Sequence, residues 1–84
     1  MDNTNKTDMK EENLETIGRR IRKLRHLRGY KQEIIAREIG LSQTAYSKIE
    51  TGDTNLTIGR ASEIAKFFGM SLTELLSWEE NVLK

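Results

Sequence analysis

Residues 32–50, QEIIAREIGLSQTAYSKIE, carry the pattern that decides the fold. Three apolar residues in its first half fall on one face of a helix: Ile35, Ala36 and Ile39. Gly40 is expected to end this helix, because glycine adopts a positive φ without a Cβ clash. Ser42 has the side chain of a good N-cap, so a second helix is expected over residues 43–50. The stretch therefore predicts two short helices joined by a tight turn.

The second of these helices is expected to be amphipathic, with Tyr46 and Ile49 pointing inward at i, i+3 spacing. Four side chains then point outward: Gln43, Thr44, Ser47 and Lys48. Amide, hydroxyl and ammonium groups are those that read base edges in the major groove of DNA. The face carries no acid before Glu50, although a solvated helix normally carries several. An exposed polar face without a task is the alternative, and we expect DNA contact instead.

Further residues give the chain a resemblance to a known family. They are Gln32, Ala36, Gly40, Ser42, Gln43, Ile49, Glu50 and Gly52, with Ile17-Gly18, Ile21-Arg22, Leu24-Arg25 and Arg28-Gly29 upstream and Asn55-Leu56-Thr57 downstream. The pattern resembles the helix-turn-helix domain of phage repressors and Cro, which also defines the Xre-like bacterial regulators. The likeness extends from about Leu14 to Leu76 and implies an all-α, compact bundle of five helices. The chain departs from the family pattern at Lys31, Tyr46 and Leu56.

The remaining helices follow from apolar spacing and end signals. Residues 1–13 are polar and are expected to be a disordered tail, leaving residues 14–84 as one domain. A first helix is expected from about Leu14, a fourth over Ile58 to Phe68 capped by Thr57, and a fifth from Ser71, where Glu74 completes a capping box. The residues expected to point inward on the fourth helix are Ile58, Ala61, Ile64, Ala65 and Phe68. The C-terminal caps are expected at Gly29, Gly40, Gly52 and Gly69.

Charge is distributed unevenly along a chain whose net charge is only +1. Residues 17–48 hold nine Lys or Arg against two Glu, whereas the segments before and after each have an excess of three acids. A positive segment that contains the two-helix motif is typical of phosphate binding. The chain lacks cysteine, so a disulfide and a thiolate metal site are excluded and a cytoplasmic location is expected. Its longest apolar run is too short to span a bilayer, and its start lacks the features of a signal peptide.

The contacts that individual residues would make with DNA follow from both geometry and the resemblance. Gln32 and Ser42 lie at the starts of the two motif helices, where free backbone N–H groups favour a phosphate, and Lys31 and Asn55 flank them. The resemblance implies base contacts at the positions of Gln43, Thr44 and Lys48, with Ser47 as a weaker candidate. It also implies that Arg25 and Glu50 form an ion pair, which positions the recognition helix against the first helix.

The C-terminal helix carries more apolar residues than one contact with the core needs: Leu72, Leu75, Leu76, Trp78, Val82 and Leu83. Two-fold dimers match operator half-sites that are about 34 Å apart. We therefore expect a homodimer on a palindromic operator, with Leu75, Trp78 and Val82 at or near the interface. In the alternative interpretation, Trp78 only closes the core.

Other classes of function are less well supported. His26 is the single histidine and has no nearby acid, and the chain contains no glycine-rich phosphate loop, so we expect no catalytic residue, no metal and no other cofactor. The stronger alternative is an antitoxin or adaptor whose main role is to bind a protein partner, such as a toxin. Within the DNA-binding interpretation, the sequence leaves open a phage-type repressor, a restriction-modification controller and a self-regulating antitoxin.

Overall fold

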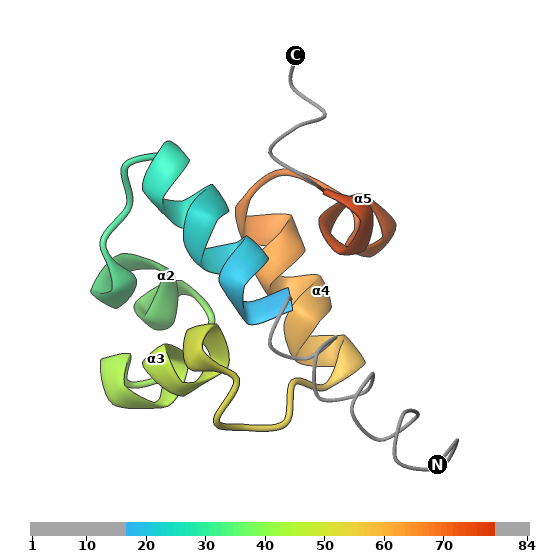
Figure 1. Ribbon diagram of the computed structural model, residues 1–84. Helices are drawn as coiled ribbons and strands as arrows, with labels where there is room; N and C mark the ends of the chain where they lie inside the picture. The colour runs from blue at the N-terminus through green and yellow to red at the C-terminus, as the bar shows by residue number, and fades with distance from the viewer. Residues whose placement is uncertain (1–16, 79–84) are drawn as a thin grey trace, which may run out of the picture.

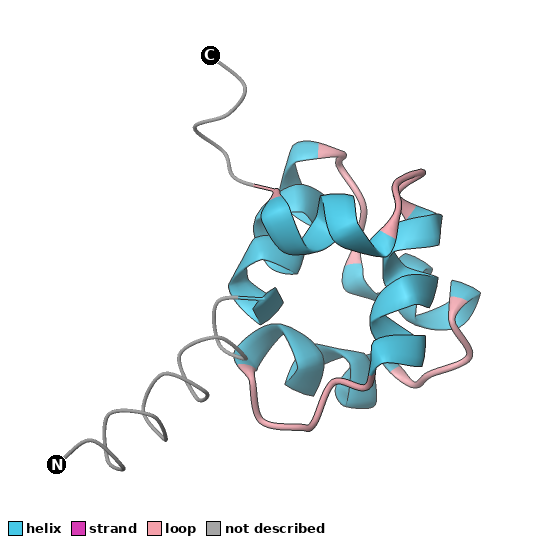
Figure 2. Cartoon of the chain, turned by 90° about the vertical axis from the view of Figure 1, so that its right-hand side faces the viewer, coloured by secondary structure: helices cyan, strands magenta, loops and turns pink. Residues whose placement is uncertain are grey.

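The computed structural model describes residues 17–78, and over this range it shows five helices (Figure 1). The first helix is described over residues 17–27, and the others are α2 (Gln32–Glu38), α3 (Gln43–Thr51), α4 (Ile58–Phe67) and α5 (Leu72–Ser77). Loops connect them, and no strand occurs in this range (Figure 2). The predicted all-α, five-helix fold is confirmed. The predicted tail over residues 1–13, the start of the first helix near Leu14, and Val82 lie outside the described residues.

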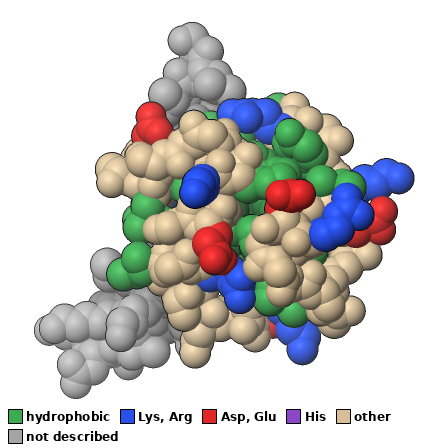
Figure 3. Space-filling model, turned by 180° about the vertical axis from the view of Figure 1, so that it is seen from behind, with side chains coloured by type: hydrophobic (Ala, Val, Ile, Leu, Met, Phe, Trp, Pro, Cys, Tyr) green, Lys and Arg blue, Asp and Glu red, His purple; other side chains and the backbone are tan. Residues whose placement is uncertain are grey.

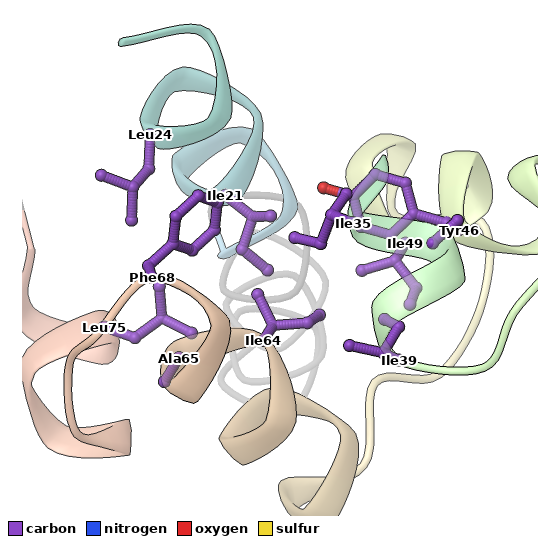
Figure 4. Close-up of a cluster of buried hydrophobic side chains, with 11 residues drawn as sticks. Ile21, Leu24, Ile35, Ile39, Tyr46, Ile49, Ile64, Ala65, Phe68 and Leu75 are labelled. Carbon is purple, nitrogen blue, oxygen red and sulfur yellow. The ribbon is translucent and has the colours of Figure 1, made fainter. Parts of the chain in front are cut away.

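The first helix and α4 occupy the centre of the molecule, with α2 and α3 packed together on one side and α5 packed on α4 at the other (Figure 1). All five helices contribute side chains to one apolar core, which Figure 4 shows as a single cluster. Its largest fully buried side chains are those of Ile21, Leu24, Ile35, Tyr46, Ile64 and Leu75. Because α3 is held through this core, its opposite face is left at the surface.

Local signals set the helix ends as the sequence predicted. The Ser42 hydroxyl accepts a hydrogen bond from the Ala45 N–H at 3.1 Å, and Thr57 caps α4 in the same way. Ser71 and Glu74 form the predicted capping box at the start of α5. The four glycines predicted as C-terminal caps all have positive φ, for example 75° at Gly40. Capping side chains and glycines act within a few residues, which is why sequence spacing was sufficient to locate these ends.

Two expectations about apolar residues were wrong. Ile58 was expected to point inward, but 75% of it is exposed. It is the first residue of α4, and helical side chains tilt toward the N-terminus, so Ile58 points beyond the end of the core. The C-terminal helix was expected to carry Trp78, but α5 ends at Ser77 and the backbone of Trp78 is extended. The Ser77 hydroxyl donates back to the Thr73 carbonyl at 2.9 Å, a bond that weakens helix continuation.

The face seen from behind mixes positive and negative side chains around small apolar areas (Figure 3). The exposed large apolar residues come from several parts of the chain: Leu27, Tyr30, Ile58 and Leu76. Within residues 17–78, no helix has the length and apolar character that crossing a bilayer requires.

Candidate nucleic-acid interface

The outer face of α3 presents the side chains that the sequence singled out for base contact. Gln43, Thr44 and Lys48 are exposed and Ser47 is half-buried. All four line a shallow depression of about 340 Å³ that Gln32, from α2, also borders. Amide, hydroxyl and ammonium groups are therefore gathered on the outer face of α3 and at the start of α2, and such groups on an exposed helix can read base edges in a major groove.

The inner face of α3 explains why these side chains point outward. Tyr46, Ile49 and Glu50 are buried, with 0%, 5% and 5% of each residue exposed. The Tyr46 ring and the Ile49 side chain lie in the apolar cluster, beside Ile35 of α2 (Figure 4). Because these three residues occupy the core side, the helix cannot rotate about its axis without removing them from their contacts.

Buried Arg25 and Glu50 form the expected ion pair between the first helix and α3. Arg25 Nε lies 2.6 Å from Glu50 Oε2, and Arg25 Nη2 lies 3.1 Å from Oε1, so the pair is bidentate. Arg25 Nη1 also donates to the Tyr30 carbonyl at 2.8 Å, just after the end of the first helix. No side-chain donor or acceptor that is buried among the described residues lacks a partner. Each buried side-chain nitrogen and oxygen of the pair thus has a hydrogen-bond partner, as a buried charge requires.

Tyr46 completes this polar cluster, a role that no sequence pattern indicated. Its hydroxyl donates to Glu50 Oε2 at 2.5 Å, from one turn earlier on α3. Burial raises the pKa of Tyr46, and the bond to Glu50 raises it further. Burial alone would also raise the pKa of Glu50, but hydrogen bonds from Arg25, Tyr46 and Gln32 outweigh it and the pKa lies below its ordinary value. Glu50 is therefore a carboxylate at neutral pH, and Tyr46 is a neutral phenol.

Gln32 is half-buried and has partners on both sides. Its Nε2 donates to Glu50 Oε1 at 3.0 Å, and its Oε1 accepts from Gln43 Nε2 at 3.4 Å. The sequence pattern predicts only a phosphate contact for Gln32. In the structure it also connects the buried carboxylate to the first residue of α3.

The other residues predicted to contact phosphate lie at the edges of the α3 face. Lys31 is the N-cap residue of α2 and makes no side-chain capping bond. Ser42 caps α3 with its hydroxyl oxygen, which leaves its O–H proton available to a phosphate. Asn55 is exposed in the loop that follows α3. Since Ser42 precedes α3 and Asn55 follows it, polar groups are placed at both ends of the outer face of α3.

Two further residues hold the α2–α3 pair in place, and sequence reasoning missed both. Gly18 lies inside the first helix where it crosses the end of α3, and a Cβ there would lie 2.4 Å from the Ile49 carbonyl oxygen. Arg60 of α4 donates to the Ile39 carbonyl at 2.6 Å, and it also pairs with Glu63. Gly18 stands inside a helical pattern where no turn is needed, and this position could have indicated a close packing contact. No local pattern identifies Arg60, because its partner lies 21 residues away.

The residues expected at or near a dimer interface are Leu75, Trp78 and Val82. Leu75 is fully buried in the core, so its side chain is not offered to a second copy, and its expected place at or near the interface stays a prediction. Trp78 is half-buried and packs against the edge of that core, and Val82 is not among the described residues.

The fold and this face together define a class: a small all-α domain whose two consecutive helices, α2 and α3, form a DNA-binding helix-turn-helix. The family model described as helix-turn-helix matches residues 21–75, and the chain belongs to this family of DNA-binding transcriptional regulators, which includes the Xre-like proteins. No curated protein gave a significant match.

Among solved structures, the chain is similar to the restriction-modification controller protein C.AhdI from Aeromonas hydrophila. The two sequences are 28% identical, and the TM-score is 0.71. The match covers 77% of this chain and 94% of C.AhdI. The similarity therefore extends over nearly the whole of the solved relative, beyond the two motif helices.

Proposed function

We propose that this protein binds double-stranded DNA sequence-specifically and regulates transcription, with α3 in the major groove. The exposed, acid-free row formed by Gln43, Thr44 and Lys48 carries this proposal, because the buried side of α3 holds the row outward. Gln43, Thr44, Ser47 and Lys48 are assigned to base edges. Lys31, Gln32, Ser42 and Asn55 are assigned to phosphates.

Charge supports the same assignment. Glu50, on the buried side of α3, is neutralised by Arg25 beneath the surface, so it does not repel phosphates. The Asp53 carboxylate, which also lines the depression, accepts a hydrogen bond from Thr51 at 2.8 Å. Lys48 and Lys31 then contribute positive charge at the rim, where a charge steers the approach to DNA.

We also infer that the protein acts as a homodimer on a palindromic operator. One α3 reads only a few base pairs, and two-fold pairing places a second copy about one helical turn along the duplex. Trp78, half-buried at the edge of the core, is the interface residue that this proposal retains. Sedimentation of the full chain and of Trp78→Ala tests it: wild type is expected to be dimeric at micromolar concentration and the variant shifted toward monomer. A monomeric wild type would rule the dimer out.

Similarity to C.AhdI favours control of a restriction-modification operon among the regulatory roles that the sequence left open. Selection of bound sites from random duplexes tests the DNA proposal directly. We expect an inverted repeat to be enriched, and affinity for it to fall steeply with salt, with a log–log slope of about −0.9 for each neutralised phosphate. An antitoxin or adaptor that binds only protein would enrich no site.

Substitutions at the interface separate base contacts from phosphate contacts. Lys48→Ala should cost about 1–3 kcal/mol on the selected site and relax the preference at one base pair. Lys31→Ala should weaken binding to all sequences alike and reduce the salt slope by about 1. Equal losses on specific and random duplexes for both variants would contradict the assignment.

A further inference from the structure

Arg60 of α4 reaches the turn between α2 and α3 and bonds to its backbone. Its Nη1 atom donates to the Ile39 carbonyl at 2.6 Å and to Glu63 Oε1 at 2.9 Å. Ile39 is the C-cap residue of α2, where the carbonyl groups have no partner within the helix. The two acceptors use both hydrogens of Nη1, so they fix the guanidinium between α4 and the turn.

The peptide unit that Arg60 holds is the softest point of this turn. Its orientation depends on ψ of Ile39 and on φ of Gly40, which is 75°. Glycine adopts positive and negative φ about equally readily, so Gly40 by itself resists rotation of this peptide only weakly. Residues 40–42 alone separate the Ile39 carbonyl from Gln43, and a rotation there would displace the start of α3. The bond from Arg60 therefore fixes the point from which α3 begins.

The two halves of α3 are held by different parts of the protein. The buried residues of α3 are Tyr46, Ile49 and Glu50, and all three come after its first turn. They fix the part of the helix that carries Lys48. Residues 43–45 have no buried side chain, so their placement depends more on the turn that precedes them. Arg60 borders a hollow that Ala45 also lines, which places it beside this first turn.

We propose that Arg60 is a positioning residue for DNA reading: it holds the turn so that Gln43 and Thr44 meet their base pairs, whereas Lys48 is placed independently of it. The proposal rests on the function proposed above, in which these three residues contact base edges. Without the bond from Arg60, DNA would have to order the turn on binding. That ordering opposes binding and weakens the selectivity of the contacts nearest to the turn.

The experiment first locates the base pairs that α3 reads. On the selected site, Gln43→Ala, Thr44→Ala and Lys48→Ala each identify the position at which base preference disappears. Affinities of wild type and Arg60→Met are then measured on duplexes that carry each of the four base pairs at these positions. Methionine keeps a long unbranched side chain and removes every donor. Arg60→Leu serves as a second variant if Arg60→Met folds poorly by circular dichroism.

Two control variants separate positioning from charge and from stability. Lys66→Met removes an equal charge from an exposed position later in α4. Ile64→Val weakens the core by an amount similar to the loss of one hydrogen bond. Hydrogen exchange of the Leu41 amide, which bonds to the Ala36 carbonyl at 2.8 Å, reports on the turn itself. This exchange should be faster in Arg60→Met than in Ile64→Val.

Arg60→Met should reduce base preference at the pairs read by Gln43 and Thr44 by about 3- to 10-fold, the equivalent of one hydrogen bond. Preference at the pair read by Lys48 should change by less than about twofold. Both controls should keep all three preferences, with at most a uniform loss of affinity in Lys66→Met.

Preferences that survive Arg60→Met would overturn the proposal, as would an equal loss at all three pairs or the same loss in Ile64→Val. If wild type selects no sequence, or if no base pair depends on α3, the proposed function itself fails. The two failures are therefore distinguishable.

Discussion

Replacing Gly18 by alanine tests how closely the first helix must approach α3. An added Cβ would lie 2.4 Å from the Ile49 carbonyl oxygen and 2.7 Å from that of Glu50, where ordinary contacts begin at 3.4 Å. Both neighbours are backbone atoms, so the two helices must separate by about 1 Å. Overpacking of this kind costs about 1–3 kcal/mol, and the better helix propensity of alanine returns up to about 1 kcal/mol. We expect Gly18→Ala to lower the free energy of unfolding by about 1–2 kcal/mol.

Gly59 provides the matched control, because it lies within α4 and an added Cβ there meets nothing within 4 Å. Gly59→Ala should raise the free energy of unfolding by about 0.5–1 kcal/mol. Urea unfolding followed by helical circular dichroism measures both variants, and for a domain of this size each kcal/mol shifts the Tm by about 4–8 °C. If Gly18→Ala were as stable as Gly59→Ala, the close crossing inferred from the structure would be refuted.

Three further predictions concern the polar cluster, the α4 contact and the core. The pKa of Tyr46 is raised above 10.0 and that of Glu50 is lowered from 4.5, so the free energy of unfolding should fall as pH rises above about 10 or drops below about 4.5. Tyr46→Phe should reduce the fall in the free energy of unfolding at alkaline pH, measured by urea titrations at several pH values. An unchanged pH profile in this variant would contradict the prediction. Arg60→Ala should cost about 1 kcal/mol through its bond to the Ile39 carbonyl, and calorimetry showing no change would indicate that the bond is not formed. Leu75→Ala should cost about 2–5 kcal/mol, because Leu75 is fully buried; a loss below 1 kcal/mol in the same measurement would place Leu75 at the surface instead.

Features that depend on neighbouring residues could be predicted from the sequence. Ser42, Thr57 and Ser71 cap helices, and Gly40 ends one, through bonds and backbone angles confined to a single turn. The five-helix fold followed because these ends divide the apolar repeats into separate helices. The outward direction of Gln43, Thr44 and Lys48 followed from helical period alone.

Features that depend on long-range packing could not be predicted in the same way. The close crossing at Gly18 requires knowledge of which helix lies across it. The burial of Leu75 depends on how α5 rotates against α4, and sequence spacing gives only the apolar stripe. The double role of Gln32 arises because residues 32, 43 and 50 meet in space.

The outward-facing residues of α3 differ in whether they bond to the rest of the protein, and this difference affects how the DNA preference of such a regulator can change. Thr44 and Lys48 are exposed, so their replacement should alter operator choice at almost no cost in stability. Gln43 shares a hydrogen bond with Gln32, so a new preference at its base pair should require both residues to change together. On the proposed base contacts, we therefore expect evolution toward a different promoter to need one substitution at Thr44 or Lys48, and a coordinated exchange across the turn at Gln43.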